Sequence, residues 1–227
     1  MSRLDDSIQR RHFLGTLLAT ASVGAAGLAL PVSPARGAET APPAPGGSEF
    51  EKWLGKIKGK HRQVFDCPAP KNGLPFAWTR VFLMTNAGVG VPEKEVTAVM
   101  VLRHDGIPLG MESRLWEKYN FGEMFEVNEP ESKKPLTMNP FWHPKEGSLP
   151  LPGMAIEDLQ ASGVLMGICD MAMTVYSQMV GKKMGLDPAE VKKDWVSGVL
   201  PGIQVVPSGV LAVNRAQEHG CTYCFAG

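Results

Sequence analysis

Cys169 is the residue whose type and setting best suit chemistry in this chain of 227 residues, which contains four cysteines and five histidines. It ends the apolar run 164–169 and is followed by Asp170 and a methionine-rich segment with helical spacing. A buried parallel strand that leads into a helix has this pattern, and α/β proteins place their sites at that junction. The sequence therefore predicts a site around Cys169.

Three interpretations of Cys169 are open. A thiol at a helix N-terminus can be activated by the helix dipole, although the neighbouring carboxylate of Asp170 disfavours a thiolate. A disulfide with Cys67, which follows the strand-like stretch 61–66, is favoured in an oxidising compartment. A free cysteine is also a common small residue of a buried core.

His104 follows another apolar run, 95–102, so it is expected at the same edge of the sheet as Cys67 and Cys169. A histidine there is either a turn residue with its hydrogen bonds satisfied or a general acid–base, because imidazole titrates near neutrality. A flavodoxin-like strand order, 2-1-3-4-5, would make the first and third strands neighbours. That order would bring Cys67 beside Cys169, at a spacing that a disulfide can bridge.

A second candidate site lies at the C-terminus, where Cys221 and Cys224 form a Cys-x-x-Cys motif. In a strand, residues three apart point to opposite faces, so these thiols would not share a metal ion. In a turn after Gly220 they would converge, and His219 would add a third ligand suited to zinc or copper. Both conformations are compatible with the sequence.

The N-terminus has the pattern of a twin-arginine export signal. Arg10 and Arg11 precede a mildly apolar run, 14–30, and small residues near 35–38 suit cleavage. We expect residues 1–38 to be a signal peptide and the mature protein to be periplasmic or secreted. An N-terminal membrane anchor is the alternative, which the weak hydrophobicity of the run disfavours.

The rest of the chain predicts a single α/β domain. Residues 39–59 read as a flexible N-terminal segment, and residues 60–227 as the domain. Short apolar runs alternate with helical patterns, which indicates a five-stranded, doubly wound parallel sheet with helices on both faces. The predicted strands are 61–66, 95–102, 164–169, 203–206 and 221–225. No later segment is long and apolar enough to span a membrane.

Three further stretches have patterns that predict local structure. Residues 74–82 repeat at helical spacing, although a strand through 78–83 competes with that interpretation. Residues 127–152 are dense in proline and form an insertion, typical of a lid, a subunit contact or a disordered segment. Met171, Val175, Met179 and Met184 are interpreted as flexible packing of the core.

The composition shows which classes of partner are not indicated. The chain carries 23 basic and 23 acidic residues and is 44% hydrophobic, an ordinary composition for a globular protein. Without an excess of positive charge, it has no electrostatic reason to bind nucleic acid.

Three stretches of the C-terminal third carry a family resemblance: GVLMGICDMA at 163–172, LPGIQVVPSG at 200–209 and NRAQEHG at 214–220. They resemble the DsrE/DsrF-like family, and the resemblance extends to Cys67 and residues 99–104. It implies a small flavodoxin-like sheet and assembly into trimers or hexamers. Some members carry persulfide sulfur on a cysteine that ends the third strand, the position that Cys169 occupies.

The sequence and this resemblance together predict an exported DsrE/F-like protein that handles sulfur or thiol redox chemistry through Cys169, assisted by Cys67 and His104. The chain departs from the pattern of the simple carriers in its export signal, its insertion and its Cys-Thr-Tyr-Cys ending. The alternative is a non-catalytic oligomeric periplasmic protein that binds a small ligand or a metal ion.

Overall fold

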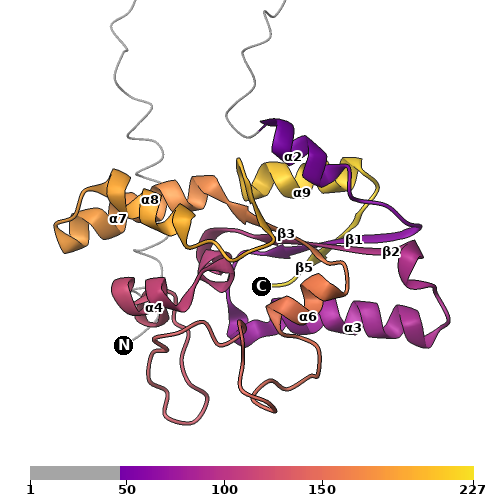
Figure 1. The fold of residues 1–227 in the computed structure, drawn as a ribbon, viewed down its shortest axis with the longest axis horizontal. Helices are drawn as coiled ribbons and strands as arrows, with labels where there is room; N and C mark the ends of the chain where they lie inside the picture. The colour runs from indigo at the N-terminus through magenta and orange to yellow at the C-terminus, as the bar shows by residue number, and fades with distance from the viewer. Residues whose placement is uncertain (1–46) are drawn as a thin grey trace, which may run out of the picture. The chain divides into compact units, whose positions relative to one another are not determined.

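The strands of this protein form one all-parallel sheet, seen edge-on in Figure 1. The computed structural model describes residues 47–227, so the predicted signal peptide and the predicted export lie outside the described residues. Within that range the strands are β1 (His61–Cys67), β2 (Val96–Leu102), β3 (Leu165–Cys169), β4 (Ile203–Val206) and β5 (Thr222–Phe225). With helices on both faces of the sheet, the predicted α/β, flavodoxin-like class is confirmed.

The strand order is β4-β3-β2-β1-β5, so the predicted order 2-1-3-4-5 is wrong. β2 lies between β1 and β3, and its buried apolar side chains pack on both faces of the sheet. The chain steps in one direction from β1 to β4, and the last crossover returns it to the opposite edge as β5. Local sequence patterns could not settle this, because right-handed crossovers are compatible with either order.

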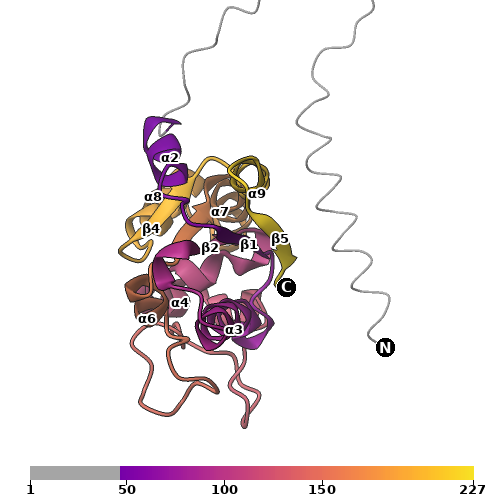
Figure 2. The same cartoon turned by 90° about the vertical axis from the view of Figure 1, so that its right-hand side faces the viewer.

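Two helices cover one face of the sheet, and the others cover the opposite face or its carboxyl edge (Figures 1 and 2). The first two are α2 (Gly47–Leu54) and α9 (Gly209–Glu218). Within residues 47–227 the remaining α-helices are α3 (Leu74–Gly88), α4 (Ser113–Tyr119), α5 (Phe121–Met124), α6 (Ile156–Ala161), α7 (Asp170–Met184) and α8 (Pro188–Ser197). The short 3-10 helices of the same range are η1 (Lys71–Gly73), η2 (Glu93–Glu95) and η3 (His104–Gly110).

The helix α3 decides the ambiguity at residues 78–83 in favour of a helix. Pro75 occupies its first turn, where the missing N–H leaves no hydrogen bond unmade. Two further helices, α8 and α9, begin at residues that are typical N-caps. The Asp187 carboxylate accepts a hydrogen bond from the Ala189 N–H, and Ser208 Oγ accepts one from the Leu211 N–H.

The helix α2 shows that the predicted flexible segment 39–59 extends too far. Phe50, Trp53, Leu54 and Ile57 are buried and pack against β1, β2 and α9. The Trp53 ring lies so close to Gly167 of β3 that a Cβ there would be 3.2 Å from it. The folded domain therefore includes residues before 60.

The insertion 127–152 is anchored to the larger core on the α3 side of the sheet. Phe141 is buried there and contacts the Phe76 ring of α3, with 4.9 Å between centroids. Asn139 is buried and donates hydrogen bonds from Nδ2 to the carbonyl oxygens of Leu109 and Met111, both at 2.9 Å. These contacts argue against the interpretation of a disordered insert.

The methionine stripe on α7 does not pack the core, so that prediction is wrong. Met171, Met179 and Met184 are each about half exposed, at 54%, 55% and 44%. The helix buries Met173, among others, on its opposite side. Helical spacing identifies a stripe, but it does not show which side of the helix faces the sheet.

No helix within residues 47–227 combines the length and apolar character needed to cross a membrane.

Candidate functional site

Cys169 lies at the carboxyl end of β3 and is the N-cap of α7. Its Sγ accepts a hydrogen bond from the backbone N–H of Ala172 at 3.2 Å. The first N–H groups of a helix have no partners inside the helix, and its dipole is positive at this end. The residue is only 6% exposed. The fold therefore places this thiol at the positive end of a helix, with its sulfur hydrogen-bonded and with limited access from solvent.

The carboxylate of Asp170, which the sequence places beside the thiol, is matched by a cation. Lys192 Nζ of α8 lies 2.9 Å from Asp170 Oδ2. This pair links the first residue of α7 to α8. It reduces the unfavourable influence that an unpaired carboxylate would have on a thiolate at Cys169.

Arg103 adds a positive charge on the neighbouring strand. Leu102 of β2 pairs with Ile168 of β3, so the next residues, Arg103 and Cys169, leave the sheet side by side. The pKa of Arg103 is raised, first by its hydrogen bonds to Asp66 and also by the charge of a Cys169 thiolate. Arg103 thus adds a positive charge at the end of the strand next to the one that Cys169 ends.

A buried carboxylate fixes Arg103 in place. Arg103 Nε and Nη2 donate hydrogen bonds to the two oxygens of Asp66, at 2.6 and 2.8 Å. The Tyr223 hydroxyl of β5 donates to Asp66 Oδ2 at 2.8 Å. Burial and this hydrogen bond to Asp66 raise the pKa of Tyr223. Three adjacent strands, β5, β1 and β2, therefore contribute to one polar cluster at the carboxyl edge.

Gly209, the first residue of α9, closes this cluster from above the sheet. A Cβ at position 209 would lie 2.4 Å from Arg103 Cβ and 2.9 Å from its Cδ. Only glycine permits this approach between the helix N-terminus and the arginine side chain. The sequence reveals this glycine only as part of the Pro-Ser-Gly turn before α9.

The structure does not bring Cys67 beside Cys169, and the predicted disulfide between them does not form. β2 separates β1 from β3, so the two strand ends are about 10 Å apart, whereas disulfides need Cα atoms within about 7 Å. Cys67 is fully buried with the larger core and donates a hydrogen bond to the Phe65 carbonyl at 3.3 Å. Burial, followed by the charge of Asp66, raises the pKa of Cys67 far above its ordinary value. All four cysteines are free thiols.

His104 begins η3 in the left-handed backbone region, with φ of 50°. Its Nδ1 lies 3.1 Å from Asp105 Oδ2, and Asp105 accepts a hydrogen bond from the Tyr176 hydroxyl of α7. Burial would raise the pKa of Asp105, but hydrogen bonds from His104 and Tyr176 outweigh it and lower that pKa. Tyr176 is about two turns along α7 from Cys169. His104 therefore connects η3 to the helix that Cys169 caps.

The predicted metal site does not assemble. Cys221 is buried in the core beneath α2 and α9, whereas Cys224 packs against the core on the opposite face of the sheet. Burial raises the pKa of Cys221 to about 11 and also raises that of Cys224. In residues 47–227 no three side chains from His, Cys, Asp and Glu converge as a metal site, so His219, Cys221 and Cys224 are not brought together.

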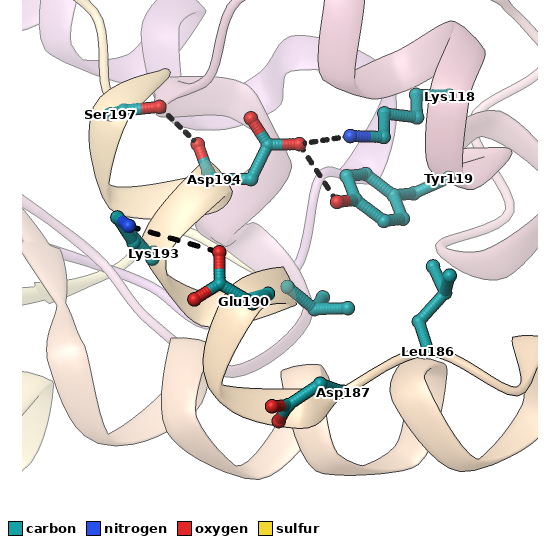
Figure 3. Close-up of a pocket in the computed structure, with 9 residues that line it drawn as sticks. Lys118, Tyr119, Leu186, Asp187, Glu190, Lys193, Asp194 and Ser197 are labelled. Carbon is teal, nitrogen blue, oxygen red and sulfur yellow. Dashed lines mark hydrogen bonds and ion pairs between the residues drawn. The ribbon is translucent and has the colours of Figure 1, made fainter.

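A separate cavity of about 540 Å³ lies between α4 and the α7–α8 hairpin (Figure 3). Its apolar wall includes Leu186 and Val191, and its polar wall centres on Asp194. Figure 3 shows the Asp194 carboxylate directed at Lys118 and Tyr119, whose Nζ and hydroxyl donate to Oδ2 at 2.7 and 2.8 Å. This cavity is built from residues that the sequence did not single out.

The residues that surround Cys169 are mostly ones that sequence reasoning missed. In the sequence, Arg103 falls only within the stretch 99–104 that the family resemblance reaches, and Asp66 only ends the predicted strand 61–66. The position of an acidic residue between Phe65 and Cys67 is the one local signal for Asp66, because a carboxylate in an apolar setting needs a partner. No family model matches this chain, and no curated protein matches it either.

Proposed function

We propose that this chain is an exported sulfur-handling protein in which Cys169 accepts and passes on sulfane sulfur. The observation that carries the proposal is the position of the Cys169 thiol at the N-cap of α7, with its Sγ hydrogen-bonded to the Ala172 N–H. The pairing of Asp170 with Lys192 and the nearby Arg103 guanidinium favour negative charge there. The resemblance to the DsrE/DsrF-like family supports the same chemistry.

The transfer needs no external oxidant or reductant. The Cys169 thiolate attacks the outer sulfur of a low-molecular-weight persulfide, a new S–S bond forms at Sγ, and the donor S–S bond breaks. The donor leaves as a thiolate with the electron pair, and the protein retains a persulfide. A thiolate is the required nucleophile, which is why groups that favour negative charge on Sγ matter.

The other predicted site residues take different places in this proposal. Cys67 has no direct part, because it is buried beyond β2. His104 is proposed as a positioning residue that acts through Asp105 and Tyr176 on α7. Residues 1–38 as a twin-arginine signal, a periplasmic location and a trimeric or hexameric assembly complete the proposal on the basis of sequence and resemblance.

The test is intact-mass analysis of the folded protein after treatment with a low-molecular-weight persulfide. Wild-type protein and Cys67→Ser are expected to gain one sulfur atom, whereas Cys169→Ser is expected to gain none. Equal gain in wild type and Cys169→Ser would reject the proposal. Because Cys67 is fully buried, circular dichroism must show that Cys67→Ser remains folded.

A second candidate function is the binding of a small amphipathic ligand in the cavity beside Asp194. The observation that favours it is the combination of an apolar wall at Leu186 and Val191 with the charged groups of Lys118 and Asp194. This function does not need Cys169. A ligand screen in which Cys169→Ser binds normally and Val191→Trp does not would favour this alternative.

A further inference from the structure

We propose that Arg103 is the anion-recognition residue of the Cys169 site, and that it selects sulfur donors whose departing group carries a negative charge. This inference deepens the proposed function and rests on it. The shared chemistry is a sulfane sulfur attached to an anionic leaving group, either sulfite in thiosulfate or a thiolate in a persulfide.

Arg103 is held in a fixed position and is still able to donate a hydrogen bond to a ligand. Its Nε and Nη2 are bonded to Asp66, and within residues 47–227 no group accepts a hydrogen bond from Nη1. The Asp66 side chain is 3% exposed, whereas that of Arg103 is 28% exposed. One end of the ion pair is therefore buried as an anchor, and the other reaches solvent at the end of β2, the strand next to the one that Cys169 ends.

Tyr223 and Gly209 also keep the Arg103 side chain in this position. Tyr223 hydrogen-bonds to the same carboxylate, so Asp66 is held in the orientation that grips Arg103. Gly209 leaves the space that the Arg103 side chain occupies. A guanidinium held in one geometry loses less conformational entropy on binding an anion than a freely moving one.

The charges and helix dipoles around Arg103 favour an anion. Asp66 balances the charge of Arg103, but the N-termini of α7 and α9 add two positive dipole ends at the same edge. Cys169 caps one of these helices, and Gly209 begins the other. An anion bound at Nη1 would thus lie between two favourable helix ends and next to the attacking sulfur.

The chemical consequence is stabilisation of the leaving group. With thiosulfate, the Cys169 thiolate attacks the outer sulfur, the Sγ–S bond forms, the S–S bond breaks, and sulfite departs with the electron pair. With a persulfide, the same attack releases a thiolate. In both reactions negative charge develops on the departing group, where a hydrogen bond from Arg103 is most effective.

The test uses iodoacetate and iodoacetamide, two reagents that alkylate a thiol by the same displacement and differ in charge. Their rate ratio at Cys169 cancels the intrinsic reactivity of the thiol, so it reports anion recognition alone. Arg103→Gln is expected to lower the iodoacetate-to-iodoacetamide ratio by roughly tenfold, as for loss of a charged hydrogen bond. Gly209→Ala, which keeps the charge but displaces the arginine, is expected to lower it in the same direction.

Two controls keep the result interpretable. Asp66→Asn/Arg103→Gln removes both partners and leaves no unpaired buried carboxylate, so it tests the same ratio if Arg103→Gln does not fold. Arg215→Gln removes an exposed arginine in the last turn of α9, at the opposite end of the helix from Gly209, and is expected to leave the ratio unchanged. A ratio that is unaltered in folded Arg103→Gln, or in the double variant, would overturn the inference.

A binding measurement separates failure of this inference from failure of the proposed function. Sulfate is titrated into Cys169→Ser while the Arg103 Nε–Hε resonance is followed by NMR. Movement of that resonance supports the anion site even if Cys169 proves unreactive, and no movement overturns it. Sulfur loading from thiosulfate and from a persulfide is then compared in wild type and Arg103→Gln, and the donor whose loading falls in the variant is the one that Arg103 recognises. If wild type and Arg103→Gln load equally from both donors, the inference is also overturned.

Discussion

Arg103 and Asp66, which lie 37 positions apart in the sequence, are joined by two parallel hydrogen bonds at the carboxyl edge of the sheet. The Asp66 end of the pair is buried on β1, and the Arg103 end follows β2, whose carboxyl end lies next to that of β3. A planar guanidinium bound to both oxygens of one carboxylate has little freedom to reorient. The candidate site is therefore organised by an ion pair that neither of its strands reveals alone.

The Asp66–Arg103 pair is expected to contribute to stability as well as to the site. Arg103→Gln should lower the free energy of unfolding by about 2 kcal/mol, because it leaves the Asp66 carboxylate buried without its main partner. Urea denaturation measures the change. Arg215→Gln, at an exposed pair with Glu218, should lower it much less. Equal losses in the two variants would show that Asp66 does not depend on Arg103.

Stability should depend on the charge of Asp194. Burial raises the pKa of Asp194, but hydrogen bonds from Lys118, Arg114 and Tyr119 outweigh it and hold that pKa at about 2, below the ordinary value of 3.8. The stabilisation is thus present above about pH 4 and disappears as the pH falls towards 2. Asp194→Asn should lower the free energy of unfolding by about 1 kcal/mol at pH 7, after screening by solvent, and by much less near pH 2. A deficit that is the same at both pH values would contradict this.

The methionines of α7 should separate into two groups. Met173→Ala should lower the free energy of unfolding by about 3 kcal/mol, because Met173 is fully buried. Met179→Gln, on the exposed stripe, should change it by no more than about 0.5 kcal/mol. Thermal unfolding of the two variants measures the difference. A large loss for Met179→Gln would mean that the stripe packs against another surface.

The N-terminal helix α2 should be part of the folding unit. Trp53→Ala should lower the free energy of unfolding by about 3–5 kcal/mol, since Trp53 is buried against Gly167 and Val206. A chain that begins at residue 60 should lose the cooperative transition altogether. Retention of full stability by the shortened chain would restore the sequence-based boundary.

The sequence predicted the elements of this fold well, because each strand and helix carries its own pattern. The run at residues 95–102 is apolar throughout, as a strand buried on both faces must be, and Asp187 and Ser208 are recognisable N-caps. The strand order was wrong because nothing inside a strand specifies its neighbour. That one error placed Cys67 beside Cys169.

The site was predicted in part. Cys169 could be selected from its position at a strand–helix junction, and the structure places it there. Arg103, Asp66 and Tyr223 could not be assembled, because they come from three strands whose order was unknown. For Cys221 and Cys224 the open question was local, strand or turn, and β5 is a strand, so the two thiols lie on opposite faces as the sequence predicts for that case.

Mapping the added sulfur to a single residue tests whether Cys169 is the thiol that accepts it. Folded protein is treated with a low-molecular-weight persulfide, free thiols are blocked, and proteolytic peptides are analysed by mass spectrometry. We expect the added sulfur atom on the peptide that contains Cys169. Cys67 should be modified only after unfolding, because it is fully buried. Sulfur found on Cys221 or Cys224, with Cys169 unmodified, would contradict it.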